Sequence, residues 1–273
     1  MEIMTVVPFA LVVLVIGAFA GVLAGLLGVG GGIVLVPAFF YAFQALGYGG
    51  AHLMQLCVAT SLATIVVTSL RSLQSHNKKG AVDWQILRSW APGIVIGAVL
   101  GTFLATQASS TVLQVIFGAA GVLVGLYMAF GKGSWRLGDA MPTGATRAVL
   151  SPAVGGLSVL MGIGGGTFGV PLMTLYNKPI HQAVATAAGF GVIIAVPSVL
   201  GFLFLTLPEA ATPPFTIGAV NLVAFALTIS MTLITTPIGV RLAHAMDPTP
   251  LKRVFAVFLT LVALNMLRAA IWG

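Results

Sequence analysis

The sequence predicts an all-α polytopic membrane protein built from two inverted repeats of about five helical elements each. Its composition is 59% hydrophobic and 6% charged, whereas soluble globular domains have about 25% charged residues. The apolar stretches are long and do not alternate with polar residues, which excludes a β-barrel and leaves helices to satisfy the backbone in hydrocarbon. A glycine-rich segment also occurs twice and interrupts an apolar stretch each time.

Ten apolar stretches follow one another along the chain, five in each half. In the first half they cover residues 8–27, 33–47, 53–73, 86–106 and 111–130, and in the second half residues 146–161, 167–176, 182–207, 217–243 and 251–271. A helix needs about 20 residues to span a bilayer. Residues 167–176 are too few to cross alone, and 33–47 is marginal, so we expect both to be glycine-broken or re-entrant elements. The predicted organisation is a first repeat over 1–131, a linker over 132–145 and a second repeat over 146–273.

The first glycine segment is defined here as residues 28–32, and the second, 134 positions later, as residues 162–166. Consecutive glycines permit left-handed backbone conformations, in which successive N–H groups form a nest for an anion. The helix that begins after each segment adds free N–H groups and a favourable dipole. Glycine-broken segments in two half-chains are typical of a transporter's binding site. We therefore expect an anion site lined by Gly30, Gly31, Gly32, Gly164, Gly165 and Gly166. The alternative is that these glycines only allow close helix packing.

Polar residues follow both glycine segments in matching order. Val58-Ala59-Thr60 corresponds to Val184-Ala185-Thr186, and each triplet has a glutamine shortly before it. Amide and hydroxyl groups can donate hydrogen bonds to an oxyanion or bridge neighbouring helices, and both interpretations stay open. The candidates are Gln55, Thr60, Ser61, Gln182 and Thr186.

A third repeated landmark lies before the next long helix of each half. Gly80-Ala81-Val82-Asp83 corresponds to Gly218-Ala219-Val220-Asn221. Asp and Asn are favoured N-cap residues. We expect Asp83 and Asn221 to cap these helices. We also expect a helix break or bend near Gln55 and Thr60, because their spacing of five does not place them on one helical stripe.

The basic residues indicate the orientation. Eleven of the twelve lie on one side if the cytoplasmic connections are 71–88, 131–147, 177–181 and 241–253, with Arg268 the exception. Both termini are then periplasmic, and an odd number of elements per half makes the repeats inverted. The first stretch lacks the basic start of a signal peptide, so we expect a retained helix. The basic residues are scattered singly, which excludes nucleic acid as a partner.

Several absences narrow the function. The five acidic residues all fall at predicted ends or connections, whereas proton-coupled carriers hold a carboxylate or histidine within the membrane. Cys57 is the single cysteine and is expected to be a small buried residue. We expect no metal, no cofactor and no enzymatic activity, because the four histidines lack ligand spacing and no catalytic constellation is evident. A passive or potential-driven pathway for a small anion fits best. The alternative is a Na⁺- or proton-coupled carrier of another small anion or organic acid.

On these motifs the chain resembles the sulfite exporter TauE/SafE family of bacterial inner-membrane proteins. The resemblance rests on both glycine segments with the prolines that follow them, on Ala59-Thr60-Ser61, and on Gly80 to Asp83. It implies export of sulfur-containing anions, sulfite or small organosulfonates, from the cytoplasm. Ala187 stands where the first half has Ser61, so the two half-sites differ chemically. Small residues on many helix faces also permit a homodimer.

Overall fold

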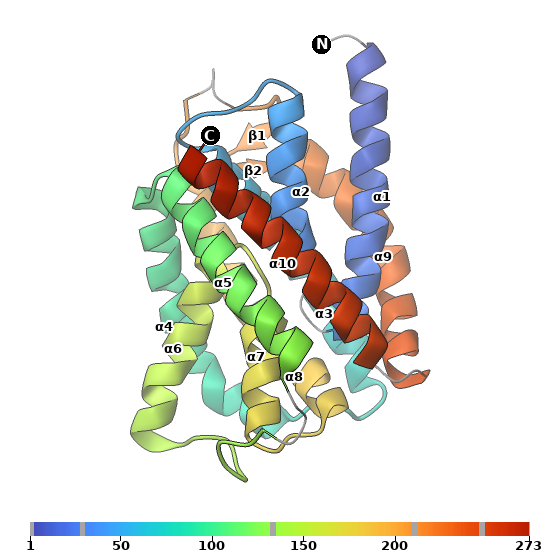
Figure 1. The fold of residues 1–273 in the computed structure, drawn as a ribbon, viewed down its shortest axis with the longest axis vertical. Helices are drawn as coiled ribbons and strands as arrows, with labels where there is room; N and C mark the ends of the chain where they lie inside the picture. The colour runs from blue at the N-terminus through green and yellow to red at the C-terminus, as the bar shows by residue number, and fades with distance from the viewer. Residues whose placement is uncertain (1–2, 28–30, 132–134, 209–211, 246–248, 273) are drawn as a thin grey trace.

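The computed structural model describes residues 3–27, 31–131, 135–208, 212–245 and 249–272. Within these ranges the chain forms ten helices and one short β-hairpin (Figure 1). The helices of the first half are α1 (Ile3–Leu27), α2 (Gly32–Ala45), α3 (Leu53–Asn77), α4 (Trp84–Gln107) and α5 (Ser110–Phe130). Those of the second half are α6 (Gly144–Leu160), α7 (Gly166–Leu175), α8 (Ile180–Leu203), α9 (Leu222–Ala245) and α10 (Thr249–Trp272).

Each of the ten apolar stretches corresponds to one helix, which confirms the all-α fold class. Five helices in the described ranges, α3, α4, α5, α8 and α9, are long and apolar enough to cross a membrane. The two elements that follow the glycine segments are short, as predicted, with 14 residues in α2 and 10 in α7.

Two local predictions are wrong. The hairpin of β1 (Thr216–Ile217) and β2 (Val220–Asn221) occupies the start of a stretch expected to be helical. Gly218, with φ of 60°, turns the chain between these strands. The expected break near Gln55 is absent, because α3 runs without interruption from Leu53 to Asn77 and contains neither glycine nor proline.

The central pair of helices is α3 and α8, which are in contact and are the two most buried of the long apolar helices. Around them, α1 packs on α9, α6 on α4, and α10 on α5. Figure 1 shows α10 and α5 side by side across one face and α1 alongside α9 at one edge. Each of these pairs joins a helix of the first half to one of the second, so the two halves share one core.

Glycines set the closest of these approaches. A Cβ atom on Gly239 of α9 would collide with the carbonyl oxygen of Val22 in α1, and one on Gly97 of α4 would collide with that of Pro152 in α6. Contacts of this kind let membrane helices gain dispersion energy where no hydrophobic effect drives them together.

Candidate functional site

The two glycine segments meet in the interior. Gly31, with φ of 78°, precedes α2, and Gly162, with φ of 64°, follows α6. A Cβ atom on Gly32 would lie 2.5 Å from the Gly162 carbonyl oxygen and 2.8 Å from the Ile163 Cα. The segments are therefore in direct backbone contact at this point. Gly30 lies outside the described residues.

Gly162 ends α6 in the left-handed conformation that only glycine adopts without strain. The Gly162 N–H donates to the Val159 carbonyl (2.8 Å) and the Ile163 N–H to the Ser158 carbonyl (2.9 Å). These bonds satisfy the last carbonyls of α6 and direct the chain towards α7. Gly164, Gly165 and Gly166 are buried.

The second glycine segment leads into the N-terminus of α7, where Gly165 is the N-cap residue and Gly166 the first residue of the helix. The first N–H groups of any helix lack an intrahelical acceptor. A Cβ atom on Gly165 would lie 2.9 Å from the carbonyl carbon of Phe190 and 3.0 Å from the Gly191 nitrogen. The N-terminus of α7 is therefore held tightly against α8 and away from water.

Two hydroxyl groups near this N-terminus are buried and have no hydrogen-bond partner within the described ranges. They belong to Ser69 of α3 and Thr167 of α7, which are 1% and 2% exposed. A Cβ atom on Gly191 would lie 3.0 Å from the Ser69 Cβ and 3.7 Å from the Gly165 nitrogen, so Ser69 faces the second glycine segment across Gly191. A buried hydroxyl without a partner costs about 1–3 kcal/mol, which makes these groups candidates for binding a ligand.

Ser61 also contacts the second glycine segment. Its hydroxyl, fully buried in α3, donates a 2.8 Å hydrogen bond to the Gly162 carbonyl. Ser69 lies two helical turns further along α3. This spacing is the signal in the sequence that could have found Ser69, which the sequence analysis missed together with Thr167.

Thr60 and Thr186 form a matched pair of contacts between the halves. The Thr60 hydroxyl accepts a 3.0 Å hydrogen bond from the N–H of Asn221, and the Thr186 hydroxyl accepts a 2.9 Å bond from the N–H of Asp83. Both threonines are fully buried. Their hydroxyls therefore anchor the N-termini of α9 and α4, and Thr60 is adjacent to Ser61, which bonds the Gly162 carbonyl.

The predicted helix caps are confirmed. Asp83 Oδ1 accepts a 3.0 Å hydrogen bond from the Ile86 N–H, and Asn221 Oδ1 accepts a 2.9 Å bond from the Ala224 N–H. Asp83 also pairs with Lys178 at 3.4 Å. Asn221 is uncharged and cannot form such an ion pair, so the N-termini of α4 and α9 differ in their electrostatics.

The two glutamines are placed at helix starts. Gln55, in the first turn of α3, is buried, and its side-chain amide donates to the Ala108 carbonyl in the connection between α4 and α5. Its Oε1 atom has no partner in the described part of the chain. Gln182 lies in the first turn of α8 and is half-buried. Among the described residues, neither side chain has a hydrogen bond to a glycine segment.

His76 is the titratable group that the structure buries most unexpectedly. It lies in the last turn of α3, is 1% exposed, and its Nε2 atom is 3.2 Å from the carbonyl oxygen of Gly25, close to the end of α1. Cys57 is fully buried, as expected. Within the described ranges no three His, Cys, Asp or Glu side chains are grouped so that they could hold a metal ion.

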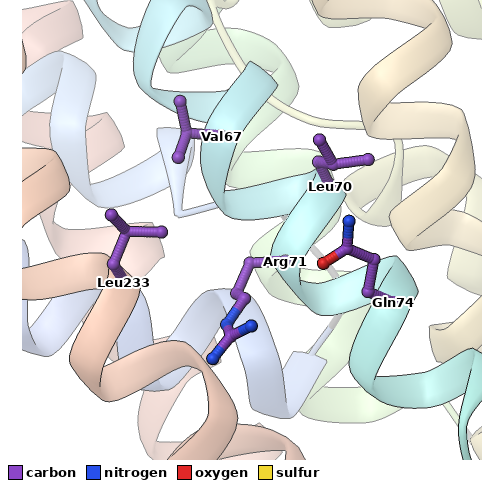
Figure 2. A pocket seen from close by; sticks show the side chains of 5 residues that line it. All are labelled: Val67, Leu70, Arg71, Gln74 and Leu233. Atoms are coloured by element: carbon purple, nitrogen blue, oxygen red, sulfur yellow. The ribbon is translucent and has the colours of Figure 1, made fainter.

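A cavity of about 370 Å³ opens between α3 and α9. It is lined by Val67, Leu70, Arg71, Gln74 and Leu233. Figure 2 shows Leu233 on α9 across from the four α3 side chains, with the Arg71 guanidinium reaching into the space between the two helices.

Comparison with known proteins identifies the family. The model described as sulfite exporter TauE/SafE matches residues 13–266. A probable membrane transporter protein of Haemophilus influenzae is 30% identical over 94% of this chain and 98% of its own length. Probable membrane transporter proteins of Methanocaldococcus jannaschii, 24% identical over 93% of this chain and 94% of the relative, and of Bacillus subtilis, 29% identical over 64% and 71%, are also similar. No solved structure matches. The chain is thus a multi-pass membrane protein that belongs to the sulfite exporter TauE/SafE family, a family of transporters and not of enzymes.

Proposed function

We propose that this transporter exports sulfur-containing anions, sulfite or small organosulfonates, from the cytoplasm across a bacterial inner membrane. The observation that supports an anion most directly is the N-terminus of α7. Helix N–H groups and the second glycine segment occur there together with the hydroxyls of Ser69 and Thr167, which have no partner within the described ranges. Helix N-termini favour anions through their free N–H groups and dipole. The sulfur chemistry comes from the family.

The proposed site binds its anion without a fixed positive charge. Gly164, Gly165 and Gly166 supply backbone N–H groups, and the Ser69 hydroxyl supplies a side-chain donor that has no competing partner within the described ranges. A weakly held anion can be released as well as bound, which a transporter requires. With the cytoplasm negative, a departing monovalent anion gains about 2.3 kcal/mol per 100 mV, so export needs no coupling ion.

We infer that the two halves are inverted repeats. The main helix contacts keep their pattern when α1 to α5 are exchanged with α6 to α10: α1 on α9 becomes α6 on α4, α3 on α9 becomes α8 on α4, and α2 on α3 becomes α7 on α8. The reciprocal bonds of Thr60 and Thr186 exchange in the same way. The start of α1 and the end of α10 lie towards the same end of the molecule (Figure 1), and in the proposed orientation the distribution of Lys and Arg makes that end periplasmic.

The second glycine segment is the more polar of the two half-sites. At the positions that correspond to Ser69 and Thr167, the other half has Ala195 and Ile33, both buried. Gly32 is also packed against the Gly162 carbonyl, which presents negative charge rather than a donor. We propose that the second segment holds the anion in this conformation, and that Gly30, Gly31 and Gly32 contribute from the opposite side when the halves move.

Sulfite efflux from proteoliposomes tests the function. Flux should appear with an imposed potential alone, in the absence of Na⁺ and of a pH gradient. Absence of flux for sulfite and for small organosulfonates in active, correctly folded protein would refute the proposal.

Ser69→Ala tests the site. Because the Ser69 hydroxyl has no partner in the described part of the chain, its removal should leave the melting temperature unchanged while raising the KM for sulfite several-fold. The matched control is Ser198→Ala in α8, which removes a buried hydroxyl that bonds its own helix at Ile194 (2.8 Å). If both variants transport like the wild type, the Ser69 hydroxyl does not bind the anion.

His76 favours a second candidate, a proton-coupled carrier of a small anion or organic acid. A histidine buried at the end of α3, against Gly25 just before the first glycine segment, could exchange a proton as the halves move. This candidate requires that flux depend on a pH gradient and that His76→Gln abolish that dependence. Flux driven by potential alone in both proteins would exclude it.

A further inference from the structure

We propose that the groove between α3 and α9 binds an anionic phospholipid, with Arg71 and Gln74 holding the phosphate and Val67, Leu70 and Leu233 contacting the acyl chain. The groove is an open hollow of about 370 Å³ at the surface, lined by these five side chains (Figure 2). The site is separate from the glycine segments, and its occupancy does not depend on which anion is transported.

Within the described ranges, Arg71 is a cation without a counter-charge. It is exposed on α3, and the structure pairs it with no carboxylate among the described residues, where the Lys178–Asp83 bridge is the ion pair present. An arginine on the surface of a membrane helix is costly unless its guanidinium reaches the interface or meets an anion. The planar guanidinium fits a phosphate through two parallel hydrogen bonds. Gln74 lies one turn further along the same helical face and adds an amide donor.

The position of the groove along α3 and α9 follows from the contact between these two helices. The bond between Thr60 and the N–H of Asn221 sets their register. Arg71 lies about 17 Å beyond this bond along α3 and Leu233 about 18 Å beyond it along α9, at 1.5 Å per residue, so the two helices run parallel. Arg71 is about 9 Å before the end of α3 at Asn77, where the exposed Lys78 and Lys79 follow. The long Arg71 side chain can therefore reach headgroup depth from a helix position inside the apolar layer.

The apolar walls favour a lipid over a soluble anion. Leu70 and Leu233 are 44% and 41% exposed and offer a surface that an acyl chain would cover but that a small inorganic anion would leave unfilled. The charge of Arg71 also has no counterpart at the matching position of the second half. In the second half, the positions that correspond to Arg71 and Gln74 are Pro197 and Leu200. In the proposed orientation the groove faces the cytoplasmic leaflet, which contains the anionic lipids.

Lipid titration of the purified full-length chain, followed by native mass spectrometry, tests the proposal. Phosphatidylglycerol should bind more tightly than phosphatidylcholine of the same acyl composition, and Arg71→Gln should weaken phosphatidylglycerol binding about tenfold while leaving phosphatidylcholine unchanged. The charge-matched control is Arg88→Gln, which removes an exposed arginine that lies over the Trp84 ring (5.9 Å to the ring centroid). This control should bind phosphatidylglycerol like the wild type.

Leu233→Trp tests the apolar part without touching the charge. The larger side chain fills the groove and should weaken phosphatidylglycerol binding several-fold, whereas Leu261→Trp, at an outward position of α10 that is 62% exposed, should not. If Arg71→Gln does not fold, Leu233→Trp and Gln74→Leu still test whether the groove binds phosphatidylglycerol.

Three results would overturn the assignment. Equal phosphatidylglycerol affinity in the wild type, Arg71→Gln and Leu233→Trp would show that the groove holds no lipid. Equal losses of phosphatidylglycerol affinity in Arg71→Gln and Arg88→Gln would show that the overall charge of the protein, and not the groove, determines the binding. Displacement of phosphatidylglycerol by sulfite or inorganic phosphate would assign the groove to a soluble anion. Because binding is measured without transport, failure of sulfite flux would refute the proposed function and leave this test unaffected.

Discussion

Replacing Gly32 by alanine should disturb the contact between the two glycine segments. The added Cβ would lie 2.5 Å from the Gly162 carbonyl oxygen and 2.8 Å from the Ile163 Cα, whereas ordinary van der Waals contact begins at 3.4 Å. Both neighbours are backbone atoms and cannot rotate away. The two segments must therefore separate by about 0.9 Å, and overpacking of this kind costs about 1–3 kcal/mol.

The separation has a second cost, because the Gly162 carbonyl also accepts the Ser61 hydrogen bond (2.8 Å). Weakening this bond adds about 0.5–1.5 kcal/mol. A total of about 1.5–4.5 kcal/mol should lower the melting temperature by about 3–18 °C, and the displaced segment should transport sulfite poorly.

Thermal unfolding of the detergent-purified protein, followed by size-exclusion chromatography, measures the fall in melting temperature. Proteoliposome flux measures the loss of sulfite transport. The matched control is Gly49→Ala, because a Cβ atom on Gly49 would meet nothing within 4 Å. If Gly32→Ala melts and transports like Gly49→Ala, the segments are not in contact and the description of the site is wrong.

The helix caps lead to three further predictions. Thr186→Val removes the acceptor of the Asp83 N–H and should destabilise the fold by about 1–3 kcal/mol, whereas Thr186→Ser should keep the melting temperature; equal melting of both variants would contradict the role of the hydroxyl. Thr60→Val should have a similar effect through the N–H of Asn221, and the double variant should show nearly additive losses because the two contacts share no partner. Asp83→Asn keeps the cap, as Asn221 does in the other half, and loses only the Lys178 ion pair. It should cost less than about 1 kcal/mol, and a larger fall in melting temperature would show that the charge matters more than the cap.

The ten helices could be predicted because hydrophobicity alone determines them. In hydrocarbon each apolar stretch must satisfy its own backbone hydrogen bonds, so composition and length identify the element. The caps at Asp83 and Asn221 were also predictable, since their acceptors reach N–H groups only three residues ahead. The hairpin around Gly218 was missed because its apolar residues continue the pattern of the following helix.

The site was less predictable because its contacts are distant in sequence. The bonds from Asn221 to Thr60 and from Asp83 to Thr186 join residues 161 and 103 positions apart. A buried hydroxyl that bridges helices and one that faces a ligand look the same in a sequence. Thr60 and Ser69 show the difference, because the first has a backbone partner and the second has none within the described ranges.

Matched positions of the two halves differ according to what they face. Thr60 and Thr186 are the same residue in both halves and make the same bond, the first with the N–H of Asn221 and the second with the N–H of Asp83. Where a position faces the interior of the second glycine segment, Ser69 is matched by Ala195. At the outer surface, Arg71 is matched by Pro197. Contacts between the halves do not always keep the residue, because Ser61 bonds the Gly162 carbonyl whereas its match is Ala187. Asp83 likewise pairs with Lys178, whereas its match Asn221 is uncharged. A difference between matched positions therefore marks a place where the two halves have different surroundings.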